Sequence, residues 1–197
     1  MVVTKTFVWA HLPKTAGDMV ATIFAQFPEI IEFADPLDAQ AKHSFFSDRP
    51  DLVAGRRRIL CIRRLPSWNL SYAHHKSHFG LHPDYLPLPM DTPEEMCVST
   101  FPDHLLSAYV EGGEAWPDRW IRVEHVIDDV LSLLEEEQVK VSWRKRRRIR
   151  AMAPQNRKVP YDRAVSSWFA PEMIDRMYEH NPLWQQAEQL AYAPTGT

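Results

Sequence analysis

The stretch T-F-V-W-A-H-L-P-K-T-A-G-D-M-V-A-T-I-F, residues 6–24, decides the fold of this chain. Residues 6–10 are mostly β-branched or aromatic and are followed by a break, which is typical of a short buried strand. Pro13 and Gly17 then predict a loop over residues 11–17. The next apolar residues recur at helical spacing, so we expect a helix. This order of strand, loop and helix directs helix N–H groups at the loop, an arrangement that suits phosphate.

Strands and helices alternate along the rest of the chain. The first helix, from Asp18, is expected to end near Pro28 because proline disfavours helix in the residue before it. Apolar runs at 59–63 and 120–123 predict two more short strands. Further helices are expected over 65–75, over 125–137 and from Pro171 onward. Strands that alternate with helices predict a parallel sheet covered by helices on both faces.

The composition is that of an ordinary globular protein. The chain has 197 residues, of which 45% are hydrophobic and 25% charged, and its formal net charge is −3. This length predicts a single domain over 1–197. With only Cys61 and Cys97, the sequence excludes a disulfide framework and a cysteine-rich zinc module. It contains no apolar run long enough for a membrane span and no secretory leader, so we expect a cytoplasmic protein.

Basic side chains gather in two short segments despite the small net charge. The first segment contains Arg56, Arg57, Arg58, Arg63 and Arg64. The second contains residues 144–148 together with Arg150. Such clusters favour recognition of anions, while a solvated helix face is the alternative for the second segment.

The loop H-L-P-K-T-A-G-D carries the residue types that a phosphate site needs. Gly17 lets the backbone approach a ligand, Lys14 adds a positive charge and Thr15 adds a hydroxyl donor. The loop lacks the pattern G-x-x-x-x-G-K-[ST], so it is not a Walker A loop. An ordinary strand–turn–helix with a surface lysine is the alternative interpretation.

This loop resembles the 5′-phosphosulfate loop of sulfotransferases that use 3′-phosphoadenosine 5′-phosphosulfate (PAPS). It is most similar to the carbohydrate-type branch, in which the loop reads H-x-P-K-T-[AG]-G-[TS]. The resemblance implies a small soluble enzyme with a P-loop-like three-layer fold, in which a central parallel sheet is flanked by helices. The donor-binding residues that it implies in this loop are Pro13, Lys14, Thr15, Ala16, Gly17 and Asp18. Asp18 departs from the usual Thr or Ser, and we interpret it as a helix cap because a carboxylate repels phosphate.

A second segment, I-L-C-I-R-R-L-P-S-W-N-L-S-Y, resembles the 3′-phosphate motif of the same family. That motif is a strand that ends in Arg, a nearby Pro and a Ser about two helical turns later. The spacing to Ser71 selects Arg63, whereas the spacing to Pro66 selects Arg64, so one residue of register stays open. We favour Arg63 with Ser71 and expect Arg64 to share the anion. Arginine gives phosphate a forked donor, and serine adds a short hydroxyl donor.

Two later segments extend the resemblance. Residues 120–130, W-I-R-V-E-H-V-I-D-D-V, resemble a strand–helix unit of the family, in which we expect Glu124 to anchor local packing. Many sulfotransferases also close a basic loop over the 3′-phosphate late in the chain. Arg157 and Lys158 fit that loop, although Val159 replaces the usual Gly.

The resemblance places the chemistry on Lys14 and a base. Lys14 suits the charge that develops on the leaving group, and a His or Glu must take the acceptor's proton. We expect His43 to be that base, because the carbohydrate-type branch has its base in this interval; a plain loop histidine is the alternative. His11 is expected to orient the loop or to pack beneath it. The cluster of His74, His75 and His78 lacks the H-E-x-x-H spacing of a zinc site.

The implied function is transfer of a sulfuryl group from PAPS to a hydroxyl of a small molecule or carbohydrate, with no metal. The product would be 3′-phosphoadenosine 5′-phosphate. Segment 76–115 is rich in Pro, His and aromatic residues and predicts the acceptor cleft, with Tyr72, Phe79, Tyr85 and Trp116 as candidate stacking residues. The alternatives are a nucleotide or small-molecule kinase with a divergent phosphate loop and a nucleotide- or polyanion-binding module without catalysis. The net charge argues against broad nucleic-acid binding, and no membrane partner is expected.

Overall fold

The central element of the protein is a mixed sheet of five strands in the order β3-β1-β2-β4-β5. A computed structural model describes residues 1–36, 40–79, 92–153 and 161–193. Strands β2 (Phe7–Ala10), β4 (Arg57–Ile62) and β5 (Arg119–Arg122) are parallel neighbours. These three are the strands that the sequence predicts, and their direction confirms the parallel part of the sheet.

Two antiparallel strands on one side of β2 make the sheet mixed, which corrects the expectation of a purely parallel one. Strand β1 (Val2–Thr4) pairs antiparallel with β2 and with β3 (Ile31–Ala34). A tight connection permits only antiparallel pairing, and here β1 and β2 are joined by two residues. The Thr4 hydroxyl closes this turn, because it accepts from the Phe7 amide and donates to the Phe7 carbonyl oxygen, both at 3.0 Å.

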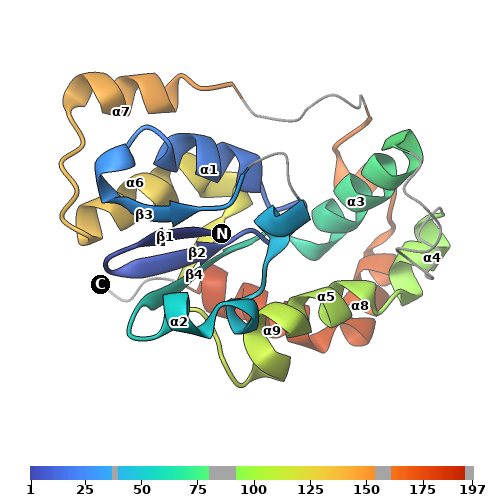
Figure 1. The fold of residues 1–197 in the computed structure, drawn as a ribbon. Helices are drawn as coiled ribbons and strands as arrows, with labels where there is room; N and C mark the ends of the chain where they lie inside the picture. Colours follow the sequence, from blue (N-terminus) through green and yellow to red (C-terminus); the bar gives the residue numbers. More distant parts are fainter. Residues whose placement is uncertain (37–39, 80–91, 154–160, 194–197) are drawn as a thin grey trace.

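Helices α1 (Gly17–Phe24) and α6 (Val126–Glu136) cover one face of the sheet (Figure 1). Alternate strand residues point to opposite faces, so Phe7 and Trp9 face this side. The helices contribute a buried apolar stripe. Helix α6 lies within the predicted range 125–137, whereas α1 begins one residue before the predicted Asp18 and ends at Phe24, before Pro28. This packing fixes the first turn of α1 at the end of β2.

The other face packs against a larger group of helices. Val8 and Ala10 point to it from β2, and Trp68 and Trp184 are among its largest fully buried side chains. The helices whose side chains join this core are α2 (Pro50–Val53), α3 (Leu65–Phe79), α4 (Pro93–Val98), α5 (Phe101–Val110), α8 (Pro171–His180) and α9 (Pro182–Tyr192). The starts of α3 and α8 agree with the sequence prediction.

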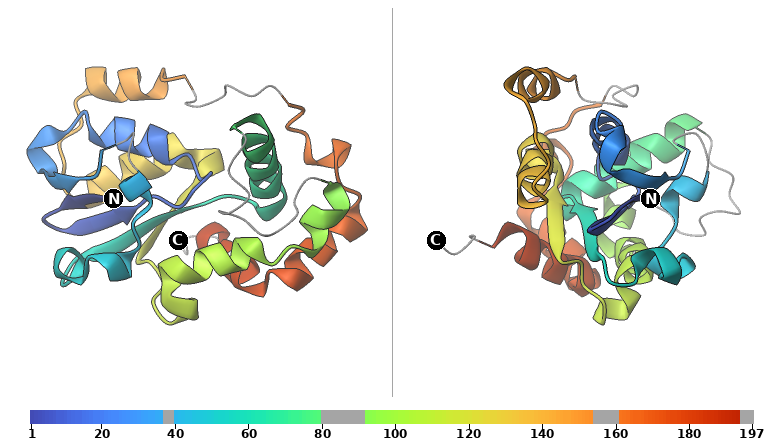
Figure 2. Two further views of the ribbon diagram at one scale, coloured as in Figure 1. Left: turned by 45° about the vertical axis from the view of Figure 1, so that its right-hand side comes forward. Right: turned by 60° about the vertical axis from the view of Figure 1, so that its left-hand side comes forward.

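Helix α7 (Trp143–Arg150) lies on the outer side of α6 in both views of Figure 2. It is fastened by the buried side chain of Ile149 and by Lys145, whose ammonium donates to the Gln26 carbonyl oxygen at 2.7 Å. The 3-10 turns of the described chain are Pro28–Ile30, Gln40–His43, Phe46–Asp48, Glu111–Gly113, Val123–His125 and Val165–Ser167. In the described part of the chain, every helix is too short or too polar to cross a membrane.

Candidate anion-binding pocket

A cavity of about 300 Å³ opens where the three parallel strands end. His11 follows β2, Arg63 follows β4 and Val123 follows β5, and each lines this cavity. The carboxyl ends of parallel strands are the common ligand site of α/β sheets. The cavity is lined by His11, Lys14, Ala16, Gly17, Asp18, Met19, Arg63, Ser71, Val123, Val126, Ile127, Met152 and Arg163.

The loop between β2 and α1 has an unusual backbone. Lys14 and Ala16 have φ angles of 64° and 60°, in the left-handed region that side chains other than glycine rarely adopt. Ala16 is the N-cap of α1 and offers no side-chain cap. Such strain persists where the surroundings impose it, and it clusters at ligand sites. Here it turns the start of α1 toward the cavity.

Two predicted loop residues hold the loop in place and do not line the cavity. The Thr15 hydroxyl donates to the Leu12 carbonyl oxygen at 2.6 Å, and Trp68 Nε1 donates to the Pro13 carbonyl oxygen at 2.9 Å. The expectation that the Thr15 hydroxyl faces a ligand is therefore wrong. Thr15 is fully buried, and its hydroxyl satisfies a loop carbonyl that would otherwise lack a partner.

Gly17 and His11 are in close contact at the base of the cavity. A Cβ atom on Gly17 would lie 1.9 Å from the imidazole of His11, so only glycine fits there. His11 is 5% exposed, and its Nδ1 is a buried nitrogen without a partner among the described residues. Burial, with smaller effects of His43 and Lys42, lowers the pKa of His11 from 6.5 to about 2. His11 is thus neutral and lies beneath the loop, as the sequence predicts.

Lys14 and Arg63 bring two cations to the cavity from different strand ends. In the described part of the chain, neither side chain has a hydrogen-bond acceptor or an acidic group within ion-pair distance. Burial, with a smaller effect of the Arg63 charge, lowers the pKa of Lys14 from 10.5 to about 8. Ser71 lines the same cavity from α3. The structure therefore brings together the main residues of both predicted phosphate motifs.

Asp18 is not the helix cap that the sequence predicts. It lies in the first turn of α1, beyond the N-cap Ala16, and its Oδ1 accepts from Lys42 Nζ at 3.0 Å. The helix starts one residue earlier than expected, which moves Asp18 past the cap position. A carboxylate thus lines a cavity that otherwise contains cations, and Lys42 is the ammonium that pairs with it.

Arg64 faces away from the cavity. Its Nη1 donates to Glu188 Oε2 at 2.9 Å, and its guanidinium lies 3.7 Å from the centroid of the Tyr192 ring. Successive residues that leave a strand point to opposite sides, so Arg63 and Arg64 cannot both reach the same anion. Arg63, and not Arg64, lines the cavity together with Ser71, and Arg64 attaches α9.

His43 lies behind the cavity, in contact with His11. Its Nδ1 is 2.9 Å from the His11 carbonyl oxygen, and the two rings have centroids 4.5 Å apart. The Tyr109 hydroxyl is 3.0 Å from the carbonyl oxygens of both histidines and can donate to one at a time. Burial lowers the pKa of His43, although the hydrogen bond to His11 opposes this shift. A neutral His43 that donates from Nδ1 has its lone pair on Nε2.

Arg163 is a cation of the cavity that the sequence does not predict. It is held over the Tyr161 ring at 4.4 Å, and Tyr161 stacks on His74 of α3 with centroids 4.2 Å apart. The predicted basic residues of this region, Arg157 and Lys158, lie outside the described residues. In the sequence, Arg163 is recognisable only as a basic residue shortly after Lys158. It reaches the cavity because Tyr161 stacks on α3 and holds its guanidinium.

Apolar side chains form the remaining wall of the cavity. They come from the first turn of α1, from the residue after β5, from the first turn of α6, and from the segment after α7. From the sequence these positions are indistinguishable from core residues, because the same helical spacing serves both. The residues are Met19, Val123, Val126, Ile127 and Met152.

Glu124 has a structural role that matches the prediction. Its Oε1 accepts from the Arg64 amide at 3.4 Å, and its Oε2 accepts from the Tyr192 hydroxyl. These contacts join the turn before α6 to the start of α3 and to α9.

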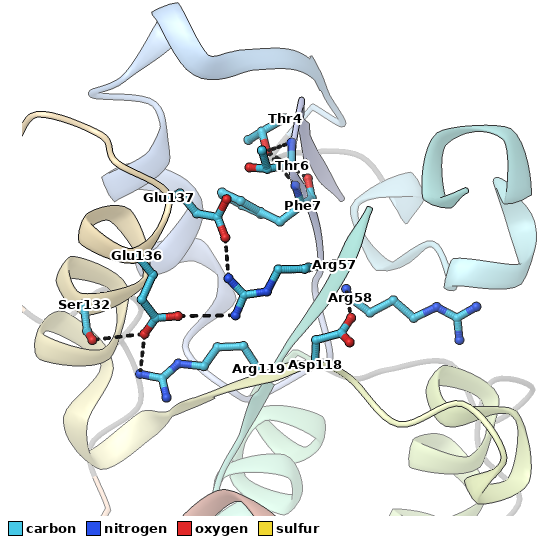
Figure 3. A network of polar contacts seen from close by, with 10 residues as sticks. All are labelled: Thr4, Thr6, Phe7, Arg57, Arg58, Asp118, Arg119, Ser132, Glu136 and Glu137. Atoms are coloured by element: carbon cyan, nitrogen blue, oxygen red, sulfur yellow. Dashed lines mark hydrogen bonds and ion pairs between the residues drawn. The ribbon is translucent and has the colours of Figure 1, made fainter. Parts of the chain in front are cut away.

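The first basic cluster mostly forms structural ion pairs at the opposite edge of the sheet (Figure 3). Arg57 bridges to Glu137 and to Glu136 of α6, and Glu136 also pairs with Arg119. These arginines belong to the amino-terminal ends of β4 and β5, away from the cavity. The expectation of anion recognition thus fails at Arg57, where carboxylates of the chain take the charge, and stays a prediction at Arg63, which lines the cavity.

The second basic cluster is the exposed face of α7. Within it, Arg146 pairs with Glu135, and Arg150 lies 3.1 Å from Asp128. Arg144, Arg147 and Arg148 have no acidic partner among the described residues. Trp143, which is 69% exposed, lies beneath Arg147 with 5.7 Å between guanidinium and ring. Part of this cluster is a solvated helix face, and part presents unpaired arginines.

Tyr72 and Trp116, the two described aromatic candidates for the acceptor cleft, do not line the cavity. Tyr72 is 7% exposed and stacks on Trp68 in the core, with centroids 4.9 Å apart. Trp116 precedes β5 and therefore lies toward the amino ends of the parallel strands. Tyr85 and the side chains of Phe79 and His78 lie outside the described residues. Among the residues that the structure describes, no three His, Cys, Asp or Glu side chains converge to hold a metal.

Comparison of the chain with family models, with curated proteins and with solved structures finds no match.

Proposed function

We propose that this protein is a sulfotransferase that moves the sulfuryl group of PAPS to a hydroxyl of a small-molecule or carbohydrate acceptor. One observation carries the proposal. Lys14, Gly17, Arg63 and Ser71, which come from two motifs more than 40 residues apart, line one cavity at the ends of parallel strands. The arrangement of helices on both faces of the parallel strands supports the finer assignment to a P-loop-like three-layer fold.

The residues of the cavity fit a nucleotide with two anionic ends. Lys14 and Arg63 supply positive charge without acidic partners among the described residues, and the buried Nδ1 of His11 lacks a partner. Lys14 and the start of α1 would hold the phosphosulfate end, whereas Arg63 and Ser71 would hold the 3′-phosphate. Arg163 would add a third cation, and the apolar wall from Met19 to Met152 suits an adenine ring.

Two residues of the chain would supply the general base and the positive charge that stabilises the leaving group. PAPS, when bound, provides a sulfuryl group activated by a bisphosphate leaving group. His43 does not line the cavity, so the acceptor hydroxyl would have to reach it beside His11. His43 would then take the acceptor proton at Nε2 as the acceptor oxygen bonds to sulfur and the bond from sulfur to the phosphate oxygen breaks. Lys14 would stabilise the electron pair that stays on that phosphate oxygen. The His11 carbonyl fixes the His43 tautomer, so the phosphate loop itself orients the base.

Two other functions would use parts of the same molecule. A kinase would need ATP with Mg²⁺, and the loop at residues 11–18 lacks the Walker A pattern. A polyanion-binding module is favoured by one observation: beside the exposed Trp143 on α7, Arg144, Arg147 and Arg148 have no acidic partner among the described residues. A cytoplasmic acceptor stays an expectation from the sequence.

Calorimetry separates these functions. We expect adenosine 3′,5′-bisphosphate to bind without Mg²⁺, and Lys14→Ala and Arg63→Ala each to weaken binding at least about tenfold. Lys140→Ala and Arg148→Ala remove exposed cations outside the cavity and serve as matched controls with unchanged affinity. Preference for ATP–Mg²⁺ would support the kinase instead. Binding of a short oligonucleotide that Arg148→Ala weakens, without bisphosphate binding, would support the polyanion module.

A further inference from the structure

Asp18 is out of place in an anion-binding pocket. It is in the first turn of α1 and lines the cavity that Lys14 and Arg63 also line. An acid at a helix N-terminus interacts favourably with the helix dipole, but here it competes with a ligand anion for the same dipole. By itself, Asp18 would weaken the binding of any phosphate or sulfate at this loop.

Lys42 changes the charge of this region. Its Nζ is 3.0 Å from Asp18 Oδ1, and the two side chains are only 22% and 28% exposed. An ammonium has three N–H donors, so the pair with Asp18 leaves others for a second acceptor. Its field reaches the cavity, because the charge of Lys42 helps to lower the pKa of Lys14, after burial and Arg63 and against the larger, opposing effect of Asp18.

The backbone that carries Lys42 is fixed on both sides. The Lys42 carbonyl oxygen accepts from the Met1 nitrogen at 3.2 Å, and the next residue, His43, contacts the His11 carbonyl oxygen through its ring. The Tyr109 hydroxyl is also within hydrogen-bond distance of the His43 carbonyl oxygen. The 3-10 turn Gln40–His43 thus presents Lys42 and His43 together to the phosphate loop.

We propose that Lys42 is a further anion-binding residue of this pocket and that Asp18 serves to hold its ammonium at the first turn of α1. This inference rests on the proposed function, and it assigns Lys42 to the phosphosulfate end of the donor. The Asp18–Lys42 pair then stands where the resembling loops have a hydroxyl residue. Its charge is neutral overall, but it offers the ligand the N–H donors of Lys42 in place of the O–H donor of a hydroxyl.

A double-mutant cycle tests the assignment, with adenosine 3′,5′-bisphosphate as the probe in calorimetry. Lys42→Met should weaken binding about tenfold, and Asp18→Asn should leave it unchanged or strengthen it, because the carboxylate charge is lost while an amide oxygen still accepts from Lys42. In the Asp18→Asn background, Lys42→Met should still weaken binding at least about threefold. Lys140→Met is the control for loss of an exposed lysine, and thermal unfolding checks that each variant is folded.

The outcomes distinguish this inference from the proposed function. If Lys42 only neutralises Asp18, the double variant binds as tightly as Asp18→Asn, and the inference is overturned while bisphosphate binding by the unmodified protein stands. If the unmodified protein binds no bisphosphate, the proposed function fails. The same cycle with inorganic sulfate then decides whether Lys42 binds an anion at this loop.

Discussion

A rise in pH removes the charge of Lys14 without any mutation, and the affinity for an anionic nucleotide should fall with it. The pKa of Lys14 is lowered from 10.5 to about 8, first by burial and then by the charge of Arg63. One pH unit above that pKa, about one tenth of the Lys14 side chains are protonated. Binding that requires the charge therefore weakens about fivefold between pH 8, where half of the side chains are protonated, and pH 9.

The direction of the effect separates Lys14 from the other groups of the pocket. Arg63 stays charged throughout this range, and the phosphates of the probe are fully ionised above about pH 7. The affinity for adenosine 3′,5′-bisphosphate should thus be flat below pH 8 and fall above it. In Lys14→Arg the fall should disappear, because arginine does not titrate there. Calorimetry from pH 6.5 to 9.5 measures both curves, and a flat curve in the unmodified protein refutes this reasoning.

The lowered pKa of Lys14 also makes the folding stability of the protein depend on pH. Between pH 8 and the ordinary value of 10.5, the unfolded chain holds a proton on Lys14 that the folded chain has lost, so stability rises with pH across this window. At pH 7 the charged, half-buried side chain therefore costs stability. Lys14→Met should raise the stability by about 1 kcal/mol, or about 2–4 °C in Tm, and abolish anion binding. The expected gain in stability is smaller than the full pKa shift would give, because solvent reaches part of the Lys14 side chain and screens its charge.

Three further changes test the packing around the pocket. Gly17→Ala should weaken bisphosphate binding more than tenfold in calorimetry and lower Tm, because its Cβ would lie 1.9 Å from the His11 ring and one of the two must move. Tyr109→Phe should cost about 1–2 kcal/mol in urea unfolding, because two buried carbonyl groups lose their shared donor, while ¹⁵N NMR should still find His43 protonated at Nδ1. Asp129→Asn should cost about 2–3 kcal/mol at pH 7, since Asp129 binds Arg122 in a bidentate pair at 2.7 and 2.9 Å. Burial raises the pKa of Asp129, but the hydrogen bonds from Arg122 outweigh burial and lower it. The difference in unfolding free energy between Asp129→Asn and the unmodified protein should therefore vanish as the pH falls below the ordinary value of 3.8.

The parallel core could be predicted from the sequence because each of its strands is an apolar run followed by a helical pattern. Strands β1 and β3 could not, since neither is an apolar run followed by a helical pattern: β1 leads through two residues into β2, and the residues of β3 alternate between half-buried and exposed. Their pairing depends on the tight turn at Thr4 and on the path of the chain after α1. This pairing depends on tertiary structure and cannot be predicted from the β-propensity of the local sequence.

The site was predictable to the level of motifs and not to the level of single side chains. Both phosphate motifs could be placed because parallel strands end at one edge of a sheet. The choice between Arg63 and Arg64 required the direction in which each side chain leaves β4. The Thr15 hydroxyl and the Asp18 carboxylate are turned to Leu12 and Lys42, because hydrogen bonds and charge within the chain compete for them.

Local rules fail together at the loop after β2, and this coincidence is an argument for function. Lys14 and Ala16 adopt the left-handed region at a cost of about 1–3 kcal/mol each, and α1 begins without a side-chain cap. Lys14 is half-buried without an acidic partner within ion-pair distance among the described residues. A loop with only a structural role would gain stability from glycine at the strained positions, from a capping residue at Ala16 and from a neutral side chain at Lys14. Each of these features instead favours an anion at the start of α1, so the stability lost in the free protein is recovered when one binds.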